Sequence, residues 1–110
     1  MSETGCAAGE RCDDVFGDPE AVADAQELAR LCKALAHPTR VLLVRYLVRY
    51  GACYFGDLSE LVGMAASTTS QHVKVLKEAG ILLASAEEQR MCYCVAPDRL
   101  EALRRLIGAL

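Results

Sequence analysis

The sequence predicts a mainly α-helical domain with one small β hairpin, in the order ααααββα. Apolar residues make up 53% of the 110 residues and aromatic residues only 5%, so the core is rich in Leu, Val and Ala, which favours helices. Five segments repeat their apolar residues at helical spacing. Two short runs, Ile81–Ser85 and Met91–Val95, instead have the character of strands.

The first two helices are delimited by proline. Asp18 provides an N-cap and Pro19 the first helical residue, so a helix is expected from there to about Ala36. His37 precedes a second proline and therefore avoids helical geometry. The next helix, over residues 38–50, is apolar on most sides and is expected to be the central helix of the core.

Residues 51–80 predict two helices joined by a tight turn. The first is expected over Phe55–Val62, where Gly63 ends it, and the second over Ala66–Ala79, where Gly80 ends it. A short turn that contains glycine between two helices is typical of a helix-turn-helix, whose second helix can enter the DNA major groove.

The exposed face of the second helix favours DNA as its partner. No acidic residue occurs from Leu61 to Lys77. Hydroxyl and amide groups can bond to base edges or phosphates, and lysines neutralise phosphates. An ordinary polar face is the alternative, but such a face normally mixes both charges. The residues expected to contact DNA are Ser67, Thr68, Ser70, Gln71 and Lys74, with Lys77 on the same face.

The two strands after this helix are expected to form a wing. Residues 86–90 would connect them, and Arg90 would then contact a phosphate or the minor groove, or remain a solvated loop charge. A last helix over residues 97–110 carries a stripe of leucines that needs a partner. We expect the first helix, from the same and from a second subunit, to cover it, which makes the protein a homodimer.

Charge divides the chain into two parts. The net charge is −3, but residues 1–28 hold eight acidic residues and one arginine, whereas residues 29–110 carry a net charge of +4. Because local charge governs attraction to phosphates, the overall sign does not exclude DNA. We expect residues 1–17 to form a mobile acidic arm that carries Cys6 and Cys12, and residues 18–110 to form the winged-helix DNA-binding and dimerisation domain.

Other classes of protein are less consistent with the sequence. It has no apolar run of 18 residues that would span a membrane and no export signal, so a cytoplasmic location is expected. It has no nucleophile with a paired base and no phosphate loop, so an enzyme is not expected. A protein-binding module that does not contact DNA remains an alternative.

Two motifs, LCKALAHPTRVLLVRYL and STTSQHVKVLKEAGIL, resemble the two signatures of the ArsR/SmtB family of winged-helix repressors. The resemblance covers about residues 25–110. It implies a homodimer that binds an inverted-repeat operator in double-stranded DNA and releases it when an inducer binds. The chain departs from the family at Ala65, where a serine N-cap is common, and His72 matches a family histidine that more often packs than contacts DNA.

The resemblance also directs attention to the cysteines, because the family senses metals at several places. The last helix has no histidine for a zinc-type site, and Tyr54-Phe55-Gly56-Asp57 replaces the family's C-V-C-D pair. Cys53 remains, just before a predicted helix, a position that favours the thiolate form. Its setting resembles that of family members in which such a cysteine joins arm cysteines of the other subunit.

A metal site of Cys6, Cys12 and Cys53 is therefore expected. Cys12 lies six residues before the first helix, and six extended residues span on the order of 20 Å. Three sulfur ligands suit As(III) or Sb(III), and also Cd, Pb or Hg. The alternative is that the two arm cysteines are idle and that Cys53 fills space.

The other three cysteines leave a redox or reactive-sulfur sensor as the alternative function. Cys92 and Cys94 lie two apart on one strand face and are expected to be core filler, with a metal or redox pair as the rival interpretation. Cys32 is expected in core or dimer packing, unless it pairs with a cysteine at the end of the wing.

Overall fold

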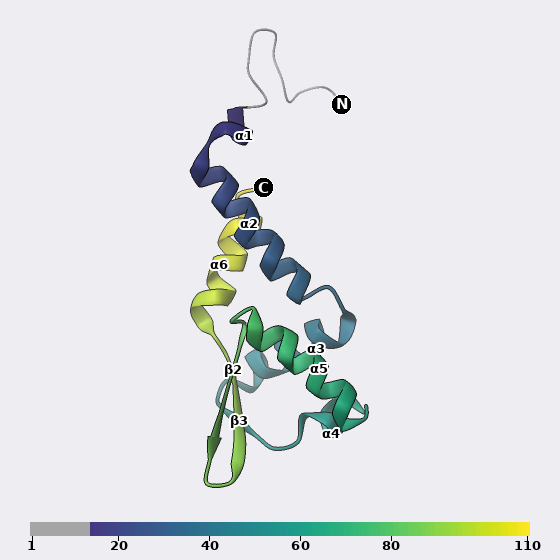
Figure 1. Ribbon diagram of the computed structural model, residues 1–110. Helices are drawn as coiled ribbons and strands as arrows, with labels where there is room; N and C mark the ends of the chain where they lie inside the picture. Colours follow the sequence, from purple (N-terminus) through teal and green to yellow (C-terminus); the bar gives the residue numbers. More distant parts are fainter. Residues whose placement is uncertain (1–13) are drawn as a thin grey trace.

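A computed structural model describes residues 14–110 and confirms the winged helix-turn-helix (Figure 1). Cys6, Cys12 and most of the expected arm lie outside the described residues. The helices are α1 (Asp14–Gly17), α2 (Pro19–Ala34), α3 (Pro38–Tyr50), α4 (Leu58–Val62), α5 (Ala66–Glu78) and α6 (Pro97–Gly108). The strands are β1 (Tyr54–Phe55), β2 (Leu82–Glu87) and β3 (Arg90–Val95).

Side-chain caps set the starts of the first long helices. The Asp18 carboxylate accepts a hydrogen bond of 3.0 Å from the backbone N–H of Glu20, where α2 begins. The His37 ring accepts one of 3.1 Å from the N–H of Thr39, where α3 begins. The bounds of α3 are those predicted, whereas α2 ends two residues before the predicted end.

The helix predicted over Phe55–Val62 starts too early, because its first residue belongs to a strand. Tyr54 and Phe55 pair with β3 as β1, and Gly56 adopts a φ of 149°. The Asp57 carboxylate then caps α4 by accepting from the N–H of Ser59 at 3.0 Å. Pairing with a strand that is distant in sequence overrode the local helical pattern.

The sheet has three antiparallel strands in the order β1-β3-β2. The predicted five-residue wing loop is wrong: β2 continues to Glu87 and β3 begins at Arg90. Only Glu88 and Gln89 form the turn, both with positive φ (50° and 68°), as a two-residue hairpin turn requires.

One apolar core joins α2, α3, α5 and the sheet. Its largest fully buried side chains are Leu31, Leu43, Leu76, Ile81 and Leu82. The last helix, α6, lies beside α2 in Figure 1 and buries Leu103 and Leu106 in the same core. None of the helices within residues 14–110 has the length and apolarity needed to cross a lipid bilayer.

Candidate nucleic-acid interface and thiol cluster

The second helix of the helix-turn-helix, α5, has one buried and one exposed side. Thr69, His72 and Leu76 are buried. The five predicted DNA contacts on this helix are all exposed: Ser67, Thr68, Ser70, Gln71 and Lys74. The N-cap residue Ala65 makes no side-chain hydrogen bond to the start of α5. The buried hydroxyl of Thr69 donates to the carbonyl of Ala65 at 3.0 Å instead.

A polar network under α5 fixes its position against α3. The Arg40 guanidinium donates to the carbonyl of Ala34 at 2.7 Å and to Nδ1 of His72 at 3.2 Å. The ring of His37 lies 4.4 Å from that of His72. Burial lowers the pKa of His72, and the charges of His37 and Arg40 lower it further, so the neutral ring accepts the bond from Arg40.

Between α5 and the wing lies a surface hollow of about 530 Å³, lined by residues of both elements. Ser70, Gln71 and Lys74 contribute from α5, and Met91 and Tyr93 from β3. The exposed face of α5 and one face of the wing therefore border the same hollow.

Arg90 lies in a different place from the loop that the sequence suggested. It is the first residue of β3, and its guanidinium carbon sits 4.3 Å from the centroid of the Phe55 ring. The cation–π contact holds this exposed charge at the base of the hairpin turn. Glu87 is its cross-strand partner and Glu88 follows, so the wing tip carries both charges.

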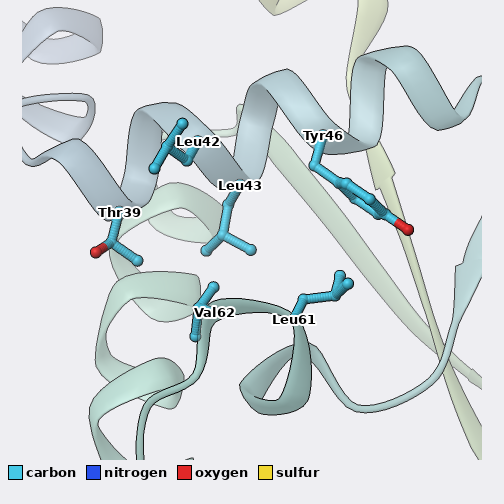
Figure 2. A pocket seen from close by; sticks show the side chains of 6 residues that line it. All are labelled: Thr39, Leu42, Leu43, Tyr46, Leu61 and Val62. Carbon is cyan, nitrogen blue, oxygen red and sulfur yellow. The ribbon is translucent and has the colours of Figure 1, made fainter.

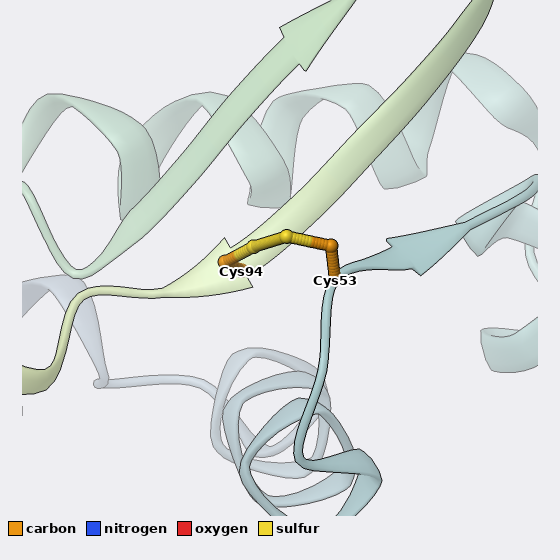
Figure 3. The surroundings of a disulfide bond; sticks show 2 residues. All are labelled: Cys53 and Cys94. Carbon is orange, nitrogen blue, oxygen red and sulfur yellow. A yellow bond between two sulfur atoms is a disulfide. The ribbon is translucent and has the colours of Figure 1, made fainter. Parts of the chain in front are cut away.

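Cys53 also lies in a setting that differs from the prediction. It precedes β1 rather than a helix, and it forms a disulfide with Cys94 of β3, as Figure 3 shows. The two Cα atoms are 4.9 Å apart. Tyr54 pairs with Tyr93, so the same register places Cys53, just before β1, opposite Cys94. The interpretation of Cys94 as core filler is therefore wrong.

A third sulfur lies beside this pair. The Sγ atoms of Cys53, Cys92 and Cys94 all lie within 4.8 Å of one another. Cys92 is only 3% exposed, as expected for core filler, and burial raises the pKa of its thiol, with Glu87 adding to the rise and Arg90 opposing it. Cys32, by contrast, is exposed on α2 rather than in the core of the chain.

The sequence missed the cluster because a two-residue strand leaves almost no pattern. The signal that pointed to it was the spacing of Cys92 and Cys94 on one strand face. Nothing in the sequence showed that Cys53 would pair beside them.

A further hollow, of about 370 Å³, separates α3 from α4. Figure 2 shows Leu42, Leu43 and Tyr46 of α3 on one side and Leu61 and Val62 of α4 on the other. With Thr39 as the remaining lining residue, this hollow presents no charged group and no acid–base pair that would support catalysis.

Comparison with known proteins identifies the relatives of this chain. A family model described as "Bacterial regulatory protein, arsR family" matches residues 37–83. The HTH-type transcriptional regulator YgaV of Escherichia coli K12 is 31% identical over 81 residues, which are 74% of this chain and 82% of YgaV. The chain belongs to the ArsR family.

Two further proteins are similar to this chain, one in sequence and one in fold. The HTH-type transcriptional regulator CmtR of Mycobacterium tuberculosis is 37% identical over 83 residues, which are 76% of this chain and 67% of CmtR. A homodimeric winged helix-turn-helix DNA-binding domain from Mycobacterium bovis superposes with a TM-score of 0.62 at 25% identity, covering 94% of this chain and 91% of that domain. The chain is thus a transcriptional regulator of the ArsR family rather than an enzyme.

Proposed function

We propose that the protein is a homodimeric repressor that binds an inverted-repeat operator in double-stranded DNA. The observation that supports this is the exposed side of α5 from Ser67 to Lys77, where alcohols, an amide and two lysines occur together. The one exposed carboxylate of the helix, Glu78, lies at its far end. Two copies related by a two-fold axis would place two such helices in successive major grooves.

Each residue of this surface has a role that its chemistry suits. Ser70 and Gln71 bond to base edges, and Lys74 neutralises a phosphate. Ser67 and Thr68 lie in the first turn of α5, where unpaired N–H groups also attract phosphate. Arg90, held against Phe55, contacts the backbone beside the wing.

Gel-shift titrations of an inverted-repeat duplex at several salt concentrations test the DNA contacts. Ser70→Ala with Gln71→Ala should weaken sequence-specific binding by about 1–3 kcal/mol for a lost base contact. Lys74→Ala should weaken binding to all sequences and reduce the salt slope by about one. Lys33→Ala, which removes an exposed lysine of α2, is the control. Equal binding by all variants would refute the assignment to α5.

We further propose that a thiophilic ion releases the operator. Cys53 is exposed, so its thiol, when reduced, is accessible to an ion and to further ligands. Cys6, Cys12 and Cys53 are the ligands expected from the sequence, with As(III) or Sb(III) as the inducer, or else Cd, Pb or Hg. Arsenite added to the reduced protein–operator complex should free the DNA. Release that persists in Cys53→Ser would refute a role for this thiol.

A redox or reactive-sulfur sensor is the second candidate, and the Cys53–Cys94 disulfide favours it. Closing this bond removes two electrons and two protons from the two thiols, which a peroxide or another disulfide would accept. Oxidant alone should then release the operator and reductant should restore binding. Cys94→Ser should abolish the response to oxidant, and retention of the response would exclude this pair as the switch.

A further inference from the structure

We infer that Cys53, Cys92 and Cys94, in their reduced form, make a three-thiolate site for a soft ion within one chain. The inference rests on the proposed function in one respect, that a thiophilic ion is the inducer. It differs in the ligands, because the site needs neither Cys6 nor Cys12. The N-terminal arm and the second subunit are then not required to hold the ion.

The sheet register brings the three sulfurs together. Cys53 lies just before β1, opposite Cys94 in the register of β1 and β3, and Cys92 lies two residues from Cys94 on the same strand. Residues at this spacing, and residues directly opposite, share one face of a sheet. Their Sγ atoms lie within 4.8 Å of one another. An ion with metal–sulfur bonds of about 2.3 Å, the value for zinc, holds its sulfurs roughly 4 Å apart.

The ligand atoms of this cluster determine which kind of ion it can bind. The cluster contains sulfur alone, with no histidine nitrogen or carboxylate oxygen among its members. An all-thiolate set suits As(III), Cd, Pb or Hg and disfavours Mg or Ca. With arsenous acid the exchange balances, because three thiol protons and three hydroxyl groups leave as three waters while three As–S bonds form.

The position of the site suggests how an ion there would act. Cys53 lies two residues after Gly51, the C-cap of α3, and Cys94 lies two residues before Ala96, the N-cap position of α6. A hollow of about 370 Å³ beside both cysteines is lined by Leu47 and Val48 of α3 and by Leu100 of α6. An ion would tie the end of α3 to the strand that joins the wing to α6.

The disulfide and the ion exclude each other in this arrangement. Cys53 and Cys94 supply both sulfurs of the disulfide, so oxidation removes two of the three ligands and leaves Cys92 free. Oxidised protein must therefore lose the site until a reductant restores the thiols.

Titration of the reduced full-length protein with Cd²⁺ tests the inference, with ultraviolet charge-transfer absorption as the measure of Cd–S bonds. Cys6→Ser with Cys12→Ser should still bind one ion per chain at wild-type affinity. Cys53→Ser and Cys94→Ser should each lose at least about 100-fold in affinity, more than the loss of a residue that merely supports a ligand. Cys32→Ser, which removes an exposed free thiol from α2, is the matched control.

A second measurement avoids substitutions, since Cys92 is buried and its replacement can disturb folding. Alkylation of reduced wild-type protein, mapped by mass spectrometry, should show that Cd²⁺ protects Cys53 and Cys94 but leaves Cys6, Cys12 and Cys32 reactive. Protection of Cys6 and Cys12 in place of Cys94 would overturn the inference.

Failure of this site can be distinguished from failure of the proposed function. Suppose that the double variant Cys6→Ser with Cys12→Ser abolishes Cd²⁺ binding and that Cys94→Ser does not. The N-terminal arm then holds the ion, so the inference is wrong, but the proposal that a metal releases the operator still stands. If Cd²⁺ binds as inferred but never frees the operator, the site stands and its role as inducer site fails. Operator binding by each ion-free variant reports separately on folding and on DNA recognition.

Discussion

At the scale of single residues, His72 shows how a buried polar side chain can support a helix whose opposite side is exposed. The family resemblance implied packing for this residue, and it is buried on the inner side of α5. Its Nδ1 accepts a hydrogen bond from Arg40, which also binds the carbonyl of Ala34 at the end of α2. A neutral imidazole is required for that bond, so protonation would work against the fold.

Stability should therefore fall at acidic pH. Burial and neighbouring charges depress the pKa of His72 in the folded protein below its ordinary value of 6.5. The unfolded chain then takes up the proton first, so the free energy of unfolding should decrease as the pH falls below about 6.5, until the folded protein is protonated too.

Urea denaturation from pH 8 to pH 5, in roughly half-unit steps, measures this dependence. His72→Gln, which keeps a polar group but cannot titrate, should make the free energy of unfolding depend less on pH. His37→Asn, which keeps an acceptor at the α3 N-cap, should retain most of the pH dependence. An equally steep loss of stability in His72→Gln would show that other groups control the pH response.

At the scale of elements, the turn between α4 and α5 sets the direction in which α5 leaves α4. α4 has only five residues, so its ends contribute a large share of its stability. Asp57 caps its start, and Gly63 ends it with a φ of 70°. A side chain at Gly63 would meet nothing within 4 Å, so only its backbone conformation opposes substitution.

Gly63→Ala should consequently lower the free energy of unfolding by about 1–2 kcal/mol, the cost of the left-handed conformation for a residue with a Cβ. Gly63→Asn should cost less, because asparagine tolerates this conformation. Gly108→Ala, at another glycine with nothing nearby but on the last turn of α6, should be neutral or stabilising. Thermal or urea unfolding of the three variants checks this, and equal effects at both glycines would contradict it.

At the scale of the whole molecule, the described chain leaves apolar surface uncovered around its first and last helices. Phe16 is 82% exposed and Leu110 is 94% exposed, and Val22 of α2 and Ile107 of α6 are also exposed. Leu103 and Leu106, on the other side of α6, already pack in the core. Uncovered apolar area of this kind is typical of a surface that a second subunit buries.

Ile107→Glu should weaken the dimer, since it would place an unpaired charge in the expected interface. We expect the dimer dissociation constant from sedimentation to rise at least about tenfold, equivalent to 1.4 kcal/mol. Operator affinity should fall with it, because two half-sites then bind separate subunits. Leu83→Glu introduces the same charge at an exposed apolar residue of β2 and should leave the dimer intact. A dimer that survives Ile107→Glu would place the interface elsewhere.

Local signals in the sequence determined most of the fold. Prolines at residues 19, 38 and 97 mark the starts of three helices, and glycines mark turns at residues 51 and 63. Apolar periodicity identified the buried side of α5 and, with it, the exposed polar side. These features depend on neighbours within a few residues, so they can be predicted from the sequence.

Tertiary structure alone decided the rest. The pairing of Tyr54 and Phe55 with β3 joins residues about forty positions apart, and it turned a predicted helix start into a strand. The same pairing placed Cys53 beside Cys92 and Cys94 and set Arg90 over Phe55. Contacts of this range are fixed by the register of the sheet, which short strands do not encode locally, so the thiol cluster emerged only once the chain was folded.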